Sequence, residues 1–165
     1  MKILSTLLIT SALFFSCNLP AQKGVKTVQQ AFPIVKTDAQ WKAELTPAEY
    51  NVLRHEGTEP AFSSSLNDNH KKGTYVCAAC GNPVFKSEHK FDSGTGWPSF
   101  DRVIDGNVAF STDNKLGYTR TEEHCAKCGG HLGHVFNDGP KETTGKRHCI
   151  NGVALNFIPD NGEAK

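Results

Sequence analysis

The stretch Cys77-Ala-Ala-Cys-Gly81 recurs further along the chain as Cys125-Ala-Lys-Cys-Gly129. Two such C-x-x-C-G elements form the four-thiolate arrangement of a structural zinc site, because each tight turn supplies two ligands of a tetrahedron. The position after the second cysteine tends to need a positive φ, which glycine adopts without steric cost. Two vicinal disulfide loops are the alternative, and the matching trailing glycines favour zinc.

The predicted zinc site has four protein ligands and no open coordination position. Its ligands are Cys77, Cys80, Cys125 and Cys128. A site closed in this way stabilises the fold and does not activate water. We therefore expect the zinc to be structural, and any chemistry has to come from other residues.

The segments around the two cysteine pairs predict a small, mainly β fold. From Gly73 onward, short β-prone pieces are separated by Gly, Asn, Asp and Pro. The predicted strands are 74–77, 108–111, 116–121 and 153–157. Short strands that follow one another with turns of this kind favour antiparallel pairing.

Two short helices are expected before this β body. Residues 38–45 are predicted to form the first helix, with Thr37 or the following aspartate as its N-cap. The sequence Thr46-Pro-Ala-Glu49 is a capping box with proline at the first helical position. The second helix is therefore predicted to run from Pro47 to about His55 and to stop at Gly57.

Length and composition are those of a single globular domain. The chain has 165 residues, of which 38% are hydrophobic and 21% charged. Its formal net charge is only +1, and it has no cluster of Lys and Arg. Because nucleic-acid binding depends on such positive charge, no nucleic acid is expected as a partner. A monomer is expected.

Residues 1–17 have the pattern of a secretory signal. Lys2 precedes a mostly apolar run, residues 3–15, which is shorter than the roughly 20 residues that span a bilayer as a helix. Cys17 follows this run and one serine, as in a bacterial lipoprotein signal whose cysteine becomes lipidated, and ordinary cleavage near Ala21 is the alternative. The protein is expected to be exported and to be periplasmic or anchored to an envelope membrane by a lipid on Cys17. Residues 18–37 are predicted to form a flexible tether.

Cys149, in the segment Arg147-His-Cys-Ile-Asn151, is the cysteine left over. If this segment is a strand, Arg147, Cys149 and Asn151 lie on one face. A guanidinium two residues from a thiol favours the thiolate, which is the nucleophilic form. The alternative is that Cys149 is a small buried core residue, which is common for a lone cysteine.

Two further segments carry unusual groups of side chains. Residues 91–100 form a glycine-flanked loop that presents the indole of Trp97, and residues 130–140 contain His131 and His134 just after the second C-x-x-C. A tryptophan is more often a core residue, and two histidines near cysteines are more often metal ligands. The zinc, however, already has four thiolates.

The motifs C-x-x-C, G-x-G-W-P-S-F, C-x-x-C-G-G-H-L-G-H-V-F and R-H-C-I-N, in this order, strongly resemble the methionine-R-sulfoxide reductase B (MsrB) family over roughly residues 41–157. The resemblance implies two antiparallel sheets (a β-tent) with zinc on the four cysteines, in a catalytic domain spanning 38–160. It makes Cys149 the catalytic nucleophile and places the other site residues at Trp97, His131, His134, Phe136, Arg147 and Asn151.

The implied reaction is the reduction of methionine-R-sulfoxide in oxidised proteins. An indole offers apolar contact for the methyl group, so Trp97 with Phe136 is expected to bind it. Donors to the sulfoxide oxygen are then expected from His131, His134 and Asn151. The Cys149 thiolate would attack the sulfur while His134 protonates the oxygen, which leaves a sulfenic acid on the cysteine. Arg147 would stabilise the thiolate.

Thr95 stands where many relatives carry a resolving cysteine. Because threonine forms no disulfide, we expect the sulfenic acid of Cys149 to be reduced directly by an external thiol, such as a thioredoxin-like protein or a small dithiol. The alternative is that an unlipidated Cys17 reaches the site on its tether.

The competing function is a non-catalytic zinc-binding β-tent that serves as an interaction or chaperone module. Fold resemblance alone does not establish activity. Maintaining a fold, however, does not require Trp97, the histidine pair and the Arg147, Cys149, Asn151 face together. The sequence therefore favours the enzyme.

Overall fold

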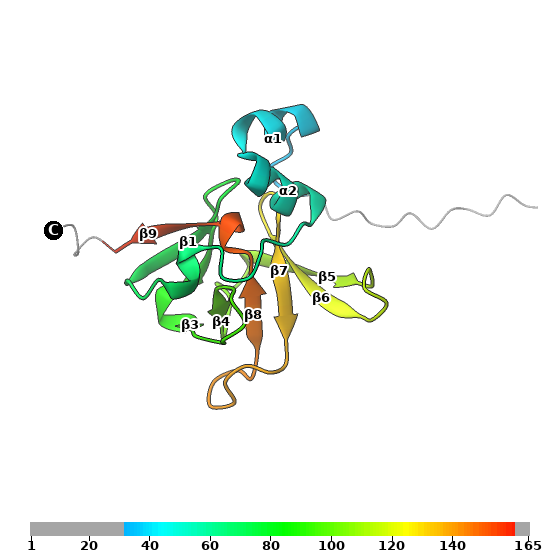
Figure 1. Ribbon diagram of the computed structural model, residues 1–165. Helices are drawn as coiled ribbons and strands as arrows, with labels where there is room; N and C mark the ends of the chain where they lie inside the picture. Colours follow the sequence, from blue (N-terminus) through cyan, green and yellow to red (C-terminus); the bar gives the residue numbers. More distant parts are fainter. Residues whose placement is uncertain (1–31, 161–165) are drawn as a thin grey trace, which may run out of the picture. The chain divides into compact units, whose positions relative to one another are not determined.

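The computed structural model describes residues 32–160 of the 165-residue chain (Figure 1). The predicted signal 1–17, including Cys17, lies outside the described residues, as does most of the predicted tether. Within the described part, no helix has both the length and the apolar character needed to cross a membrane.

Two short helices come first, and both begin where the sequence predicted. Helix α1 (Asp38–Glu44) has Thr37 as its N-cap, and helix α2 (Pro47–His55) has Thr46. Each cap forms a complete capping box, in which the threonine accepts the N3 backbone N–H and the N3 side chain accepts the threonine N–H. Helix α2 ends at His55 because Glu56 adopts a left-handed conformation, with φ of 56°.

The segment before α1 differs from the prediction of a free tether. The backbone N–H of Ile34 donates to the carbonyl of Lys127 over 2.8 Å. The Phe32 ring lies so close to Gly129 that a Cβ there would be 2.5 Å from it. Residues 32–37 are therefore held against the domain, which begins before residue 38.

The strands form two antiparallel sheets, as predicted (Figure 1). The three-stranded sheet has the order β2 (Pro83–Lys86), β1 (Gly73–Cys77), β9 (Leu155–Pro159). The six-stranded sheet has the order β3 (Lys90–Phe91), β4 (Ser99–Phe100), β8 (Arg147–Ile150), β7 (His131–Phe136), β6 (Arg120–Cys125), β5 (Val108–Asp113). Short 3₁₀ turns occupy Ser65–Asp68, Ser87–His89 and Gly152–Ala154.

Two predicted strands are displaced. Residues 116 and 117 lie in the turn between β5 and β6, where the N–H of Gly117 donates to the carbonyl of Asn114, so the strand begins only at Arg120. Val153 lies in a 3₁₀ turn, and its strand begins at Leu155. In both places a local turn takes precedence over the β propensity of apolar residues.

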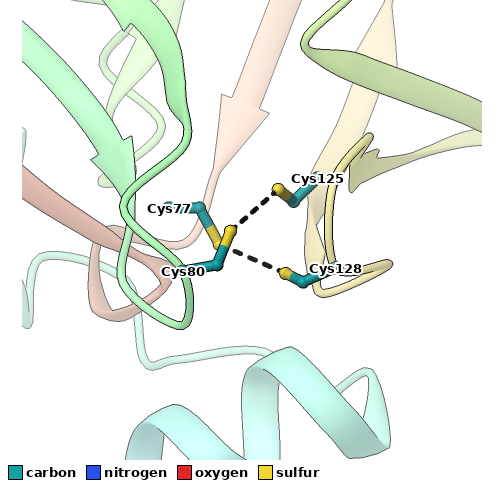
Figure 2. Close-up of side chains that lie close together, drawn as sticks. All are labelled: Cys77, Cys80, Cys125 and Cys128. Atoms are coloured by element: carbon teal, nitrogen blue, oxygen red, sulfur yellow. Dashed lines mark hydrogen bonds between the residues drawn. The ribbon is translucent and has the colours of Figure 1, made fainter. Parts of the chain in front are cut away.

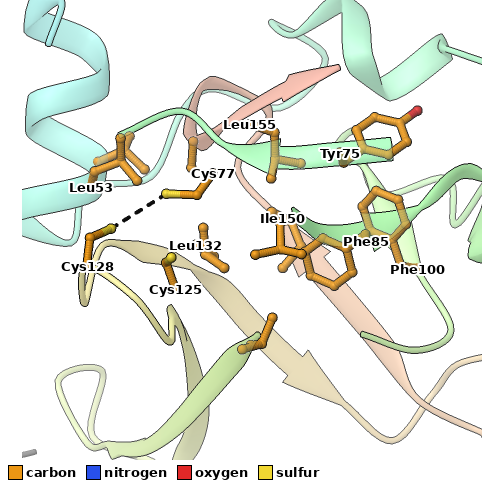
Figure 3. Close-up of a cluster of buried hydrophobic side chains, with 14 of the residues drawn as sticks. Leu53, Tyr75, Cys77, Phe85, Phe100, Cys125, Cys128, Leu132, Ile150 and Leu155 are labelled. Carbon is orange, nitrogen blue, oxygen red and sulfur yellow. Dashed lines mark hydrogen bonds between the residues drawn. The ribbon is translucent and has the colours of Figure 1, made fainter. Parts of the chain in front are cut away.

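The hydrophobic core runs from the cysteine pairs to a group of aromatic rings (Figure 3). Phe85 stacks on Phe100 with ring centroids 4.3 Å apart, and Tyr75 meets Phe100 edge-on at 5.0 Å. Leu53 of α2 and Leu132 of β7 belong to the same cluster. Burying a side chain of this size contributes about 1.5–3 kcal/mol. The helix and both sheets therefore share one core.

Strand β8 is held in the six-stranded sheet by a neighbour on each side. Cys149 pairs with Ser99 of β4 and with His134 of β7. Strand β7 approaches so closely that a Cβ on Gly133 would lie 2.1 Å from the Cys149 carbonyl oxygen. No side chain fits there, and the backbone of Cys149 is thereby fixed in place.

Candidate active site and metal centre

The four cysteines of the C-x-x-C pairs form one cluster. Figure 2 shows their side chains converging from two separate loops. The Sγ atoms of Cys77 and Cys128 are 3.7 Å apart, those of Cys80 and Cys125 are 3.5 Å apart, and all four lie within 4.8 Å of one another. Zn–S bonds of about 2.3 Å in a tetrahedron give sulfur–sulfur distances of roughly 3.8 Å. The cluster therefore fits a zinc ion.

The two cysteine loops have the same backbone construction. The N–H of Gly81 donates to the Cys77 carbonyl over 2.8 Å, and the N–H of Gly129 donates to the Cys125 carbonyl over 2.9 Å. The φ angles of these glycines are 70° and 69°, which confirms the expected positive φ. All cysteines in residues 32–160 are free thiols, so the disulfide alternative is not realised there.

The cysteine cluster connects elements that are far apart in the sequence. Cys77 ends β1 of the three-stranded sheet, and Cys125 ends β6 of the six-stranded sheet. A guanidinium N–H of Arg54 in α2 donates to the Cys128 carbonyl over 3.0 Å. An ion held here would therefore join both sheets close to the helix, which is a structural role.

Cys149 lies in β8, where buried and half-buried residues alternate as expected for a strand. Its Sγ is 3.9 Å from the Thr95 hydroxyl, which also contacts the Ser93 hydroxyl at 2.8 Å. Burial raises the pKa of the Cys149 thiol, against the hydrogen bond from Thr95 and the charge of Arg147, which both lower it. The resting form is therefore the thiol.

Arg147 favours the thiolate of Cys149, in the direction expected from the sequence, and it also forms an ion pair with Asp138. Its guanidinium donates to both carboxylate oxygens of Asp138, over 2.9 and 2.8 Å, and lies 4.5 Å from the centre of the Phe136 ring. Its effect on the thiol has the expected direction but is smaller than the effect of burial. The spacing of residues along the strand predicts that Arg147 lies near the thiol. It does not show how far the thiol is removed from water, which is what raises its pKa.

His134 faces Cys149 across the β7–β8 pair and has a carboxylate behind it. Its Nε2 lies 2.8 Å from Oδ2 of Asp113, which also accepts from Arg120. Hydrogen bonds from the Lys115 backbone N–H and from His134 lower the pKa of Asp113 to about 2. Because this carboxylate is ionised, Nε2 of His134 carries the hydrogen and Nδ1 remains for other partners. Burial lowers the pKa of His134.

His131 lies behind His134. It is 2% exposed, its Nδ1 is 2.5 Å from Oε1 of Glu122, and its ring centroid is 5.5 Å from that of His134. Burial lowers the pKa of His131. The structure therefore places His131 next to the pocket described below and not on its surface.

A pocket of about 140 Å³ opens above Cys149. Its lining includes five residues singled out from the sequence: Trp97, His134, Phe136, Cys149 and Asn151. Thr58, Arg120 and Gly133 also line it and were not predicted. Aromatic rings, a thiol, an imidazole and an amide thus converge on a space suited to a small group with an apolar part and a hydrogen-bonding part.

Glu59 is a further residue of the site that the sequence did not indicate. Its carbonyl accepts from Trp97 Nε1 over 3.1 Å, and its N–H donates to Asn151 Oδ1 over 3.0 Å. Its buried carboxylate accepts from the N–H groups of Gly152 and Val153, over 2.6 and 2.8 Å. No motif marks this residue, because its partners are far away in the chain.

Comparison with known proteins gives one consistent result. Residues 45–159 match the SelR domain family. A protein of Leptospira interrogans called peptide methionine sulfoxide reductase MsrB is 54% identical over 127 residues, which cover 76% of this chain and 96% of that protein. Proteins of the same name from Thiobacillus denitrificans and Methanosarcina mazei are 54% and 51% identical, over 75% and 80% of this chain and 94% of each relative.

Among solved structures, the crystal structure of the Mis18 "Yippee-like" domain aligns with 53% of this chain and 96% of that chain. Its TM-score of 0.43 and sequence identity of 14% are too low to support an inference.

The substitution Cys77→Ser tests the role of the cysteine cluster. We expect the purified variant to hold less than one zinc per chain and to lose its cooperative thermal unfolding transition, because the ion joins the two sheets. Zinc content and circular dichroism measure both effects. Cys149→Ser is the matched control and should keep full zinc and the wild-type transition. A zinc-free Cys77→Ser protein that unfolds at the wild-type temperature would contradict the structural role.

The reactivity of Cys149 should depend on pH in the direction set by its burial. Because its pKa is raised, the thiolate forms only at higher pH, and alkylation by iodoacetamide should have a higher midpoint than in an unstructured cysteine peptide. Thr95→Val should raise the midpoint further, since the thiolate loses a hydrogen bond. Mass spectrometry of the Cys149 peptide gives the rate. A midpoint below that of the reference peptide would rule out the described environment.

Proposed function

The chain belongs to the SelR-domain family of MsrB peptide methionine sulfoxide reductases, and from this premise we propose how its residues carry out the reaction. It is a peptide-methionine (R)-S-oxide reductase, which returns oxidised methionine in proteins to methionine. The observation that carries the proposed mechanism is the pairing of Cys149 with His134 across β7 and β8, at the base of the pocket.

The substrate sulfoxide binds in this pocket with its two ends in different surroundings. The methyl group packs against Trp97 and Phe136, whose rings provide apolar contact. The oxygen accepts hydrogen bonds from His134 and from Asn151. One Nδ2 hydrogen of Asn151 is donated to the Leu132 carbonyl over 3.0 Å, which leaves the other for the substrate.

Proton transfer between Cys149 and His134 starts the reaction. The resting pair is a thiol and a neutral imidazole, because burial raises the pKa of Cys149 and lowers that of His134. The thiol proton moves to Nδ1 of His134, and the Asp113 carboxylate on Nε2 stabilises the imidazolium that forms. Asp113 is a positioning residue in this scheme, since it acts through the histidine.

The thiolate sulfur then attacks the sulfoxide sulfur while His134 returns the proton to the sulfoxide oxygen. The attack forms a bond between the two sulfurs as the protonated oxygen leaves the substrate sulfur, and this hydroxyl then adds to the Cys149 sulfur, which breaks the sulfur–sulfur bond and releases methionine. The methionine sulfoxide is reduced by two electrons to methionine, and Cys149 is oxidised by two electrons to a sulfenic acid. General acid catalysis of this type contributes about 10²- to 10⁴-fold.

The remaining residues of the predicted site hold the others in position. Arg147 and Asp138 form an ion pair over the Phe136 ring, which fixes one wall of the pocket. His131 and Glu122 support His134 from behind. Zinc on the four clustered cysteines supplies no chemistry to the substrate and stabilises the fold.

The sulfenic acid of Cys149 is reduced by a thiol from another molecule, such as a thioredoxin-like protein. The Thr95 hydroxyl lies 3.9 Å from the Cys149 sulfur, and threonine at this position cannot form a disulfide with it. The other cysteines among residues 32–160 belong to the metal cluster.

We also propose that the protein is exported, because residues 1–17 have the pattern of a secretory signal. The N-terminal residue of the protein isolated from the cell envelope tests this. A lipidated Cys17 or a cut near Ala21 supports export, and a retained Met1 contradicts it.

An assay with dithiothreitol and the two epimers of a methionine sulfoxide tests the mechanism. Wild type should reduce the R epimer, and Cys149→Ser should lose activity by about a thousandfold or more while keeping its zinc. His134→Asn should lower kcat by about 10²- to 10⁴-fold. Turnover of the S epimer alone, or undiminished turnover by Cys149→Ser, would refute the assignment.

A single turnover without reductant tests the external-thiol step. After one equivalent of sulfoxide, wild type should carry a sulfenic acid on Cys149 that dimedone traps, without a disulfide. Thr95→Cys should instead form a disulfide with Cys149, since the two side chains are neighbours, and Thr95→Ser should behave as wild type. A disulfide that contains Cys149 in the isolated wild-type monomer would count against the proposal.

A further inference from the structure

Phe62 combines exposure with an unfavourable backbone conformation. Its φ is 63°, in a turn closed by a hydrogen bond from the Ser63 N–H to the Pro60 carbonyl. Phe62 is the third residue of this turn, a position that takes glycine when φ is positive. Its side chain is nevertheless large, apolar and 70% exposed.

The ring of Phe62 packs against Gly96, the residue before the tryptophan of the pocket. The Phe62 N–H donates to the Gly96 carbonyl over 2.7 Å. Gly96 has a φ of 91°, and a Cβ on it would lie 2.8 Å from two carbon atoms of the Phe62 ring. Gly96 therefore leaves space for this ring, and the next residue along the chain is Trp97.

The loop that carries Phe62 is anchored to the site. Three residues before it, Glu59 bonds through its main chain to Trp97 and Asn151, and Thr58 lines the pocket directly. Phe62 is thus exposed on a segment that contributes Thr58 to the pocket lining and is hydrogen-bonded to two other pocket residues.

Folding alone does not account for this arrangement. A ring that is 70% exposed gains little from burial, while a bulky residue at positive φ destabilises the chain. Other exposed apolar residues, such as Ile158 and Leu116, do not have a positive φ. The backbone of Phe62 is strained, and burial of its ring does not compensate for that strain. Strain of this kind in the segment beside the pocket points to a ligand.

We propose that Phe62 is a subsite for the polypeptide on either side of the oxidised methionine, where its ring packs against an apolar side chain that flanks the sulfoxide. This rests on the proposed function, since the substrate is a peptide. The pocket of about 140 Å³ receives a side chain, so the rest of the substrate has to lie on the surface around it, which the segment from Thr58 to Phe62 borders. The occupant is therefore an unfolded, oxidised segment with apolar residues next to methionine.

Three substrates and one substitution test this. They are an N-acetylated, C-amidated methionine-R-sulfoxide, a peptide with leucine on both sides of the sulfoxide, and the same peptide with glycine on both sides. Phe62→Gly should lower kcat/KM for the leucine peptide by about tenfold and change the other two values by less than twofold. Its thermal midpoint should equal or exceed that of wild type, because glycine tolerates the positive φ.

The control Ile158→Ala removes an exposed apolar residue of β9 in the other sheet and should change none of these values. An equal loss on all three substrates, no loss on the leucine peptide, or a midpoint several degrees below wild type would overturn the subsite. If wild type reduces none of the substrates, the proposed function fails and the subsite with it. If wild type is active and Phe62→Gly lowers kcat/KM equally for all three substrates, the subsite is contradicted and the proposed function is not.

Discussion

Four thiolates that meet at one point are the constraint on which the domain depends. Strand β1 of one sheet and strand β6 of the other each end at a cysteine of this cluster, and α2 bonds to the loop between Cys125 and Gly129. The apolar core continues directly from the sulfurs to Leu132 and the aromatic rings. The order of β6, β7 and β8 then follows by antiparallel pairing, so the position of Cys149 depends on an ion that takes no part in its chemistry.

The protein thus uses cysteine in two different roles, one at the metal cluster and one at the pocket. At the metal cluster, four sulfurs converge on a point that fits one ion, which is a structural arrangement. At the pocket, a single sulfur is half-buried, burial raises the pKa of its thiol, and in the proposed mechanism it gains its charge when His134 accepts the proton. A thiol that is mostly protonated at rest is protected from oxidants that react with thiolates, which matters for an enzyme whose substrates arise under oxidation.

Features set by neighbouring residues could be predicted from the sequence, and features set by distant contacts could not. The capping boxes at Thr46 and the turn glycines at the cysteine pairs are local, and both were predicted. The role of Glu59 depends on Asn151, 92 residues away, and the pairing of Asp113 with His134 depends on the order of the strands. The effect of Arg147 on the Cys149 thiol was expected from the sequence, but the larger effect of burial, which raises the pKa of that thiol, was not.

The bonds of Glu59 to the two walls of the pocket have a consequence for substrate size. Trp97 is bonded to its carbonyl and Asn151 to its N–H, which are main-chain atoms of one residue. Only one rotatable bond, the Cα–C bond of Glu59, lies between those two atoms, so their separation varies by no more than about 1 Å. The main chain of Glu59 therefore limits how far Trp97 and Asn151 can move apart. A substitution at position 59 removes the carboxylate contacts to Gly152 and Val153 but keeps the two main-chain bonds, so the anchoring of the loop should change more than the width available to the thioether.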